Sequence, residues 1–493
     1  MWWPKLSIKM FHKIIRVCAR LVRVGQFLVT VGALVATSFI CAPSIAAAQT
    51  VFGTASHVVA AAGASPRSQL DELEGLLRLA DSVNPSIVAA RHGVDAARAR
   101  VTPAATLPDP MLMLGIQNVP LGKTPPSMMS MSGGPDPMTM RMIGIEQTVP
   151  YPGKLSLRRR AAAREVDAAS ASVDAITRQV EADVKDAYYE LAFADQALSI
   201  VGRNRDVLAG FIRVTETRYS VGSSGQQDVL KARVEATRLA ETAVTLTEQR
   251  RASLARLNAL LSRPSDTPVD NPVIPAAVTR AAVPAEASEI RFTSTALGAR
   301  AADSPLPPLA DLQETAVRES PELREQDAMV AAQTTRLALA RKEVLPDFDV
   351  SLQYGQRGGG LPDMITALVS VPLPVFKGRK QNQSVVESGA ELASLQAQRA
   401  QKENEIRAEV ARLVSELERS RSQLALYVKA LLPQARASLS SATASYQVGR
   451  VEFLTVLDDQ ATVFNYETEY FRVLSDFARN LAQLERVVGK EVL

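Results

Sequence analysis

The side chains best suited to chemistry in this sequence are methionines gathered in one short stretch. The chain has twelve methionines, and eight of them lie between Met111 and Met142. Thioether sulfur is a soft ligand that selects Cu(I) over hard cations, and Ag(I) should follow by the same softness. Methionine is also a flexible apolar filler of strands and loops, and this alternative stays open. The candidate metal ligands are Met128, Met129, Met131, Met138 and Met140.

Other residue types that carry chemistry are scarce, which argues against an enzyme. The chain has only two cysteines, Cys18 and Cys41, and three histidines. Its sequence contains no Cys/His zinc motif, no nucleophile–His–acid set, no phosphate-binding glycine loop and no dinucleotide fingerprint. We therefore expect no catalytic residues and no cofactor.

The N-terminus has the order of an export signal. Six cations and no acid occupy positions 5–23, an apolar stretch follows at 27–40, and three alanines end at Ala48. This order is typical of a secretory signal peptide, predicted over residues 1–48, and an uncleaved membrane anchor is the alternative. Cleavage would remove both cysteines and leave residues 49–69 as a flexible N-terminal segment.

The basic balance of the chain comes from that same segment. Lys and Arg number 56 against 52 Asp and Glu, and without the six N-terminal cations the counts become 50 against 52. No basic cluster with interleaved aromatic residues remains. We therefore expect no nucleic-acid partner.

Landmarks that recur in the same order indicate an internal duplication. Leu-Pro-Asp stands at 107–109 and 345–347, and Val-Pro-x-Pro at 149–152 and 371–374. Tyr-x-Val-Gly stands at 219–222 and 446–449, followed at equal distance by Val-Leu. The repeats are predicted over residues 70–262 and 311–493. The proline-rich segment 263–310 is predicted to be an inter-repeat linker on the outside of the structure.

Between the first two landmarks, each repeat is predicted to form two strands. Residues 348–354 and 364–371 alternate apolar and polar side chains, which suits a strand with one apolar face. A membrane β-barrel strand and a soluble hairpin both fit this pattern. Arg357 and the glycines at 358–360 predict the connecting loop. The same interval of the first repeat is longer, and the surplus falls in the Met-, Pro- and Gly-rich stretch 120–137.

A long helix is predicted after each pair of strands. No proline occurs from Lys154 to Val221, and apolar residues recur every seven positions from Val166 to Leu208. Heptad spacing is typical of coiled-coil packing. The second copy, residues 381–448, has the same spacing from Val410 to Leu431, and Pro433 is expected to kink it.

Four strands from one exported chain cannot close a barrel, and an open sheet edge is not tolerated in lipid. Two chains would supply eight strands, whose side chains fill the interior. Three chains would supply twelve strands and leave a pore. The predicted fold is therefore mainly α, with a duplicated helix–hairpin–long-helix unit and a trimeric 12-stranded membrane barrel.

From about Leu70 to Val488 the sequence resembles the TolC-type outer-membrane efflux channel family. The Tyr-x-Val-Gly and Val-Leu pairs and the Val-Pro-x-Pro entries to the long helices carry the resemblance. It implies a homotrimer in outer-membrane lipid, with a helical tube in the periplasm. It also implies helix turns at residues 221–230 and 448–457, where the channel closes and a periplasmic adaptor protein docks. The residues of this docking tip are Val221, Gly222, Val448 and Gly449.

The resemblance also implies an entrance gate. Asp458 matches an acidic ring of three identical carboxylates, although a solvated acid beside Asp459 is the alternative. Thr455 stands where the family pattern has Asp, which places a second ring in doubt. Asp228 and Tyr446 match a pair that holds the tip shut, and the family's neighbouring Arg is displaced here to Arg450.

The expected function is the exit duct of a tripartite efflux system. The methionine-rich segment resembles the heavy-metal branch of the family, which works with an inner-membrane resistance–nodulation–division pump. The cargo would then be Cu(I) and Ag(I), or Co, Zn and Cd. A drug-efflux or type I protein-secretion channel is the alternative within the family. A periplasmic coiled-coil adaptor is the alternative from another class, although a duplicated strand–helix order does not favour it.

Overall fold

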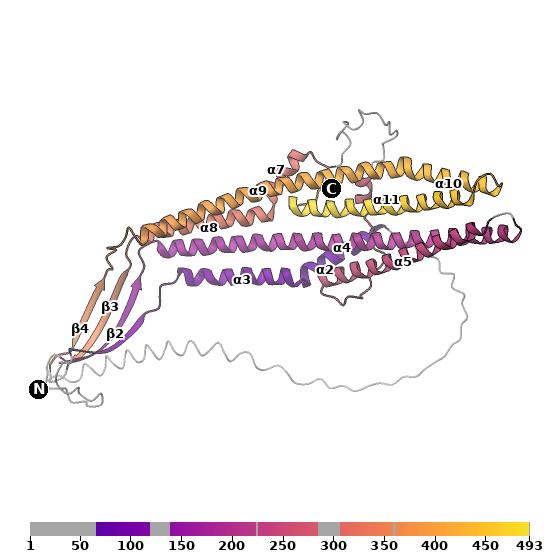
Figure 1. The fold of residues 1–493 in the computed structure, drawn as a ribbon. Helices are drawn as coiled ribbons and strands as arrows, with labels where there is room; N and C mark the ends of the chain where they lie inside the picture. Colours follow the sequence, from indigo (N-terminus) through magenta and orange to yellow (C-terminus); the bar gives the residue numbers. More distant parts are fainter. Residues whose placement is uncertain (1–65, 119–138, 223–224, 284–305, 358–360, 493) are drawn as a thin grey trace, which may run out of the picture. The chain divides into compact units, whose positions relative to one another are not determined.

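The computed structural model describes residues 66–118, 139–222, 225–283, 306–357 and 361–492. Two successive halves carry the same order of short helices, two strands and long helices, which confirms the predicted duplication (Figure 1). The first half contains α2 (Pro66–Val83), α3 (Pro85–Ala105), β1 (Met111–Gln117), β2 (Met140–Val149), α4 (Lys154–Ser220) and α5 (Gln226–Leu260). The second contains α7 (Leu309–Glu319), α8 (Pro321–Glu343), β3 (Phe348–Arg357), β4 (Met364–Ser370), α9 (Gln381–Leu426), the π-helical turn η2 (Tyr427–Leu431), α10 (Leu432–Gln447) and α11 (Phe453–Val488).

The longest element is α4, which runs without a break for 67 residues. At about 1.5 Å per residue such a helix reaches roughly 100 Å. It packs against α3, α5, α8 and α11. The predicted heptad row is buried from Val180 through Ala187, Ala194 and Val201 to Leu208, and half-buried further toward the N-terminus. The coiled-coil interpretation is therefore confirmed.

The second long helix is interrupted where the sequence has Pro433. A π-helical turn at Tyr427–Leu431 separates α9 from α10, and Pro433 lies in the first turn of α10. Proline cannot donate to the carbonyl four residues earlier, and its ring crowds that carbonyl. A π turn is a common way for a helix to accommodate such a break. The expected kink therefore takes the form of a local change in helix type.

The four strands form one antiparallel sheet in the order β1-β2-β3-β4. Strand β3 is longer than predicted, because Arg357 still pairs with Met140 instead of opening the loop. Strands β1 and β2 are separated by residues 118–139, whereas β3 and β4 are separated only by residues 358–363. The predicted insertion at 120–137 lies outside the described residues.

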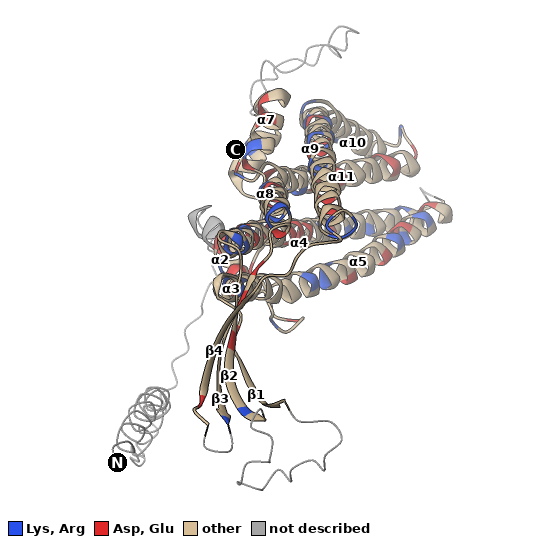
Figure 2. Ribbon diagram, turned by 90° about the vertical axis from the view of Figure 1, so that its left-hand side faces the viewer, with Lys and Arg blue, Asp and Glu red and all other residues tan. Residues whose placement is uncertain are grey.

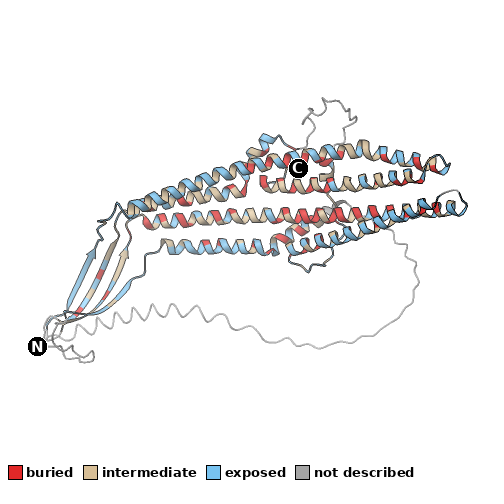
Figure 3. Cartoon of the chain, viewed as in Figure 1, coloured by how far each residue is buried: buried red, intermediate tan, exposed pale blue. Residues whose placement is uncertain are grey.

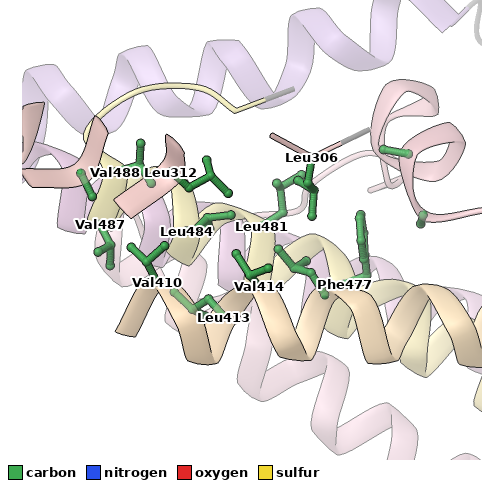
Figure 4. Close-up of a cluster of buried hydrophobic side chains, with 14 of the residues drawn as sticks. Leu306, Leu312, Val410, Leu413, Val414, Phe477, Leu481, Leu484, Val487 and Val488 are labelled. Carbon is green, nitrogen blue, oxygen red and sulfur yellow. The ribbon is translucent and has the colours of Figure 1, made fainter. Parts of the chain in front are cut away.

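The interior of the helical part contains several apolar clusters. The largest joins α7, α8, α9 and α11, with Phe477 and Leu413 fully buried (Figure 4). Contrary to the predicted external linker, the connecting segment contributes to this cluster through α6 (Ala276–Ala282) and Leu306. Ala281 and Ala282 are buried because this short helix packs against α9 and α11. The predicted signal peptide and nearly all of the segment 49–69 lie outside the described residues.

Candidate channel site: the sheet and the helix turns

One face of the sheet is apolar from edge to edge. In the register, Leu114 lies opposite Ile143, which lies opposite Tyr354, which lies opposite Ile365. These side chains are exposed, with Leu114 at 72% and Ile365 at 75%. The whole of edge strand β4 is coloured as exposed (Figure 3). Exposed apolar residues on one face of adjoining strands are typical of a surface that contacts lipid.

The other face of the same strands is polar. Successive side chains of a strand point to opposite faces, so Glu146, Ser351, Gln353 and Thr366 share the face opposite Leu114. Lys, Arg, Asp and Glu crowd the helices, whereas β1 and β4 have none (Figure 2). The sheet therefore has the two-sided character of a barrel wall with lipid outside and water inside.

Two glycine-ended helix turns lie at the far ends of α4 and α10 from the strands. Gly222 and Gly449 both have φ +73°, a conformation that favours glycine. The Gly449 N–H donates to the Tyr446 carbonyl at 3.0 Å, and the Arg450 N–H donates to the Ser445 carbonyl at 2.9 Å. This pair of bonds is the Schellman motif. The Tyr-x-Val-Gly sequence therefore recurs because each helix ends in a backbone conformation that favours glycine.

The valine before each glycine is strongly exposed. Val221 is 72% exposed and Val448 is 69% exposed. Each follows the last residue of its long helix, α4 or α10. Two isolated apolar side chains on the turns suit contact with a partner, although single exposed apolar residues are common.

The two turns are joined by Arg218, which the sequence analysis missed. Its Nη1 donates to the Tyr446 carbonyl at 2.9 Å and its Nη2 to the Gln447 carbonyl at 2.7 Å. The same guanidinium lies over the Tyr446 ring, 4.4 Å from the centroid. The two carbonyls belong to the last turn of α10, where no N–H of the helix follows to bond them, and the Tyr446 carbonyl also accepts the Gly449 N–H of the cap. Arg218 therefore ties the end of α4 to the end of α10.

Tyr446, one of the predicted gate residues, is buried. Its ring lies 5.6 Å from that of Phe453, within an apolar cluster near the turns. Among the described residues its hydroxyl has no hydrogen-bond partner. Asp228 lies half-buried in the first turn of α5, and within this single chain the Tyr446 hydroxyl makes no hydrogen bond to it. Arg450 contributes its backbone to the α10 cap and is exposed.

Asp458 and Thr455 are exposed on the first turns of α11. Asp458 lines an open groove between α5 and α11, which also contains Lys231 and Arg238. The neighbouring Asp459 faces α10 and accepts a hydrogen bond from Ser438 at 2.9 Å. The two adjacent acids therefore have different surroundings, and only Asp458 belongs to the groove.

Of the five candidate metal ligands, only Met140 lies in the described part of the chain, on β2. The segment with Met128, Met129, Met131 and Met138 lies outside it. Within the described residues, no three His, Cys, Asp or Glu side chains are grouped to hold a metal ion. Nor does any described helix combine the length and apolar character needed to cross a membrane.

Comparison with solved structures shows the same fold in several channels. The outer-membrane channel OprN matches with a TM-score of 0.68 and 18% identity, over 86% of this chain and 91% of that one. The outer membrane protein VceC of Vibrio cholerae matches with a TM-score of 0.67 and 18% identity, over 86% and 97%. CusC, whose structures concern transmembrane channel formation, matches with a TM-score of 0.67 and 15% identity, over 85% and 92%.

Sequence comparison agrees with the structural one. The cobalt-zinc-cadmium resistance protein CzcC of Cupriavidus metallidurans is 24% identical over 429 residues, which cover 85% of this chain and 90% of that protein. The family model described as outer membrane efflux protein matches residues 76–263 and 312–490. These two matches follow the two structural halves. The chain therefore belongs to the outer membrane efflux protein family.

Proposed function

We propose that three copies of this chain form the exit duct of a tripartite efflux system. The observation that carries this proposal is the four-stranded sheet, one face of which is apolar and exposed. Among the described residues, the outer edges of β1 and β4 have no neighbouring strand. Unpaired edges must be satisfied inside a membrane. Three copies would join edge to edge into twelve strands around a water-filled lumen.

The exposed apolar segment after β4 supports contact between copies. Leu373, Val375 and Phe376 are each more than two-thirds exposed in the single chain. They lie between edge strand β4 and the start of α9. A neighbouring copy joined to β4 would cover part of this segment.

The cargo we propose is a heavy-metal cation. The similarity to a cobalt-zinc-cadmium resistance protein along most of both chains supports this class. The methionine-rich sequence adds the soft cations Cu(I) and Ag(I). Drug efflux and type I protein secretion remain the alternatives for the same fold, whereas the family assignment excludes a periplasmic adaptor.

At the opposite end, the helix turns would form the closed entrance. Asp458 from three copies would present a ring of carboxylates that attracts cations, flanked by Thr455. Asp228, Tyr446, Arg450 and the newly found Arg218 would hold this entrance shut. The exposed Val221 and Val448, set by Gly222 and Gly449, would contact the adaptor that links the duct to an inner-membrane pump.

A deletion strain tests the cargo. Its sensitivity to Co, Zn, Cd, Cu and Ag salts is compared with its sensitivity to a panel of apolar drugs and with its secreted proteins. We expect sensitivity to at least one metal, reversed by a plasmid-borne copy and not by an empty plasmid. Drug sensitivity or lost secretion with unchanged metal resistance would contradict the proposal and favour an alternative.

A further inference from the structure

Methionines in the sheet all lie on one face. Met111, Met113, Met140, Met142 and Met364 occupy alternate positions in their strands, opposite residues of the polar face in the register. The mostly apolar face carries leucine, isoleucine, valine, tyrosine, phenylalanine and alanine in the described strands, together with Arg141, Gln147 and Gln356, and no methionine. If methionine served only as apolar filler, it would be expected on that face as well.

Three of these methionines neighbour a single glycine, two of them through the strand register and one through its side chain. In the register, Gly355 on β3 lies opposite Met142 on β2 and opposite Met364 on β4. Met140 leans over the same glycine, because a Cβ built on Gly355 would lie 2.9 Å from the Met140 Sδ. The three side chains thus come from two strands that flank a position with no side chain of its own.

A second glycine, on β1, leaves space beside Met142 on its other side. Gly115 on β1 lies opposite Met142, and a Cβ at Gly115 would meet nothing within 4 Å. Met142 therefore has glycine on both neighbouring strands, Gly115 and Gly355. Thioether side chains can approach one another only where the residues between them are small. Gly115 and Gly355 provide this space beside Met142.

The geometry points to a thioether site for a soft monovalent cation, Cu(I) or Ag(I), formed by Met140, Met142 and Met364 on the lumen face of the sheet. Three thioethers supply neutral, soft ligands, which suit these cations and not Zn(II) or Co(II). The site rests on the proposed channel function and names its cargo class.

The test uses full-length protein extracted and assembled in detergent. Met128, Met129, Met131 and Met138 are first changed to Leu, so that sulfurs of the connecting segment do not obscure the result. On this background Met140→Leu, Met142→Leu and Met364→Leu are combined, because Leu keeps the volume and removes the sulfur. Met111→Leu is the matched control, since Met111 shares the face but lies opposite Glu146.

Ag(I) is the probe, measured by titration calorimetry and by metal content after desalting. We expect the background and the control to bind about one Ag(I) per chain, and the triple variant to lose this equivalent or bind about tenfold more weakly. Zn(II) should not compete. Unchanged Ag(I) binding by the triple variant, or no binding by the background, would overturn the site.

Assembly is checked by migration of the unheated oligomer on gels, so that misfolding is not mistaken for lost binding. Gly355→Ala is a second route to the same end. Its Cβ would occupy the space beside the Met140 sulfur, so it should weaken Ag(I) binding with every thioether retained. Ag(I) binding is measured on purified protein, whereas the proposed function is tested by the metal sensitivity of the deletion strain. A loss of the binding site would therefore not be confused with a failure of the proposed function.

Discussion

Lys154 and Asp347 form an ion pair between the two repeats, with the Lys154 Nζ 2.7 Å from the Asp347 Oδ1. Lys154 is the first residue of α4, and Asp347 directly precedes β3. The same Nζ donates to the Leu345 carbonyl at 2.7 Å, and the Tyr151 N–H donates to the Asp347 Oδ1 at 2.8 Å. The Lys154 side chain is only 4% exposed. This contact joins the start of β3 in the second repeat to the start of α4 in the first.

Replacing Asp347 with Asn should lower the stability of the assembled protein by about 1–3 kcal/mol, because the buried Lys154 charge loses its counter-ion. Thermal dissociation of the oligomer on gels would measure the change. Lys154→Met in the same chain removes the stranded charge, so the double variant should recover part of the loss. A double variant as unstable as the sum of the two single variants would show that the pair is not coupled.

The pH dependence of stability gives a second test of this pair. Burial alone would raise the pKa of Asp347, but the hydrogen bonds from Lys154 and the Tyr151 N–H outweigh it and leave the pKa below the ordinary 3.8. The pair therefore contributes its full stability above that value, and the contribution is lost as the pH falls through the lowered pKa. Wild-type protein should lose stability on acidification below about pH 4, and Asp347→Asn should lose less. Parallel pH profiles would contradict this assignment.

Arg218→Met should loosen the proposed closed entrance. It removes two charge-assisted hydrogen bonds and a cation–π contact that together amount to about 2–4 kcal/mol in one chain. We expect larger or more frequent openings in planar bilayers. The control is Arg213→Met, which removes an exposed cation five positions earlier on the same helix. Equal single-channel currents in the two variants would show that Arg218 does not hold the turns.

Asp458→Asn should weaken the block of single-channel current by multivalent cations, because three negative charges would leave the entrance. Thr455→Asp should strengthen it by adding three. Asp459→Asn is the matched control, since it makes the same change one residue away, where the side chain bonds Ser438. Block left unchanged by Asp458→Asn, or weakened as much by Asp459→Asn, would contradict a ring formed by Asp458 alone.

The features that the sequence predicts are those that depend on a regular spacing of residues along the chain. The duplication, the four strands and the buried heptad row from Val180 to Leu208 follow from spacing alone, because period and proline placement govern helices and strands. Gly222 and Gly449 could be located because the turn requires glycine. The Pro433 break was placed correctly, but its π-helical form depends on how the surrounding helices pack.

Other features depend on contacts between distant segments. Arg218 binds backbone carbonyls of residues 446 and 447, and carbonyls carry no sequence signal. The equivalent position in the second repeat is Ser445, so comparison of the two repeats does not single out Arg218. The grouping of Met140, Met142 and Met364 needs the strand register, which the alternation of one strand does not supply. The burial of Ala281 and Ala282 likewise follows from packing against α9 and α11.

The unpaired outer edges of β1 and β4 have a genetic consequence. A chain damaged at one edge still offers the other, so it would enter a ring with normal copies and leave a seam open. If damaged and normal chains are made in equal amounts and mix freely, only about one in eight trimers contains normal copies alone. Mutations at β1 or β4 should therefore be dominant in merodiploid cells, whereas variants that prevent a chain from folding should be recessive.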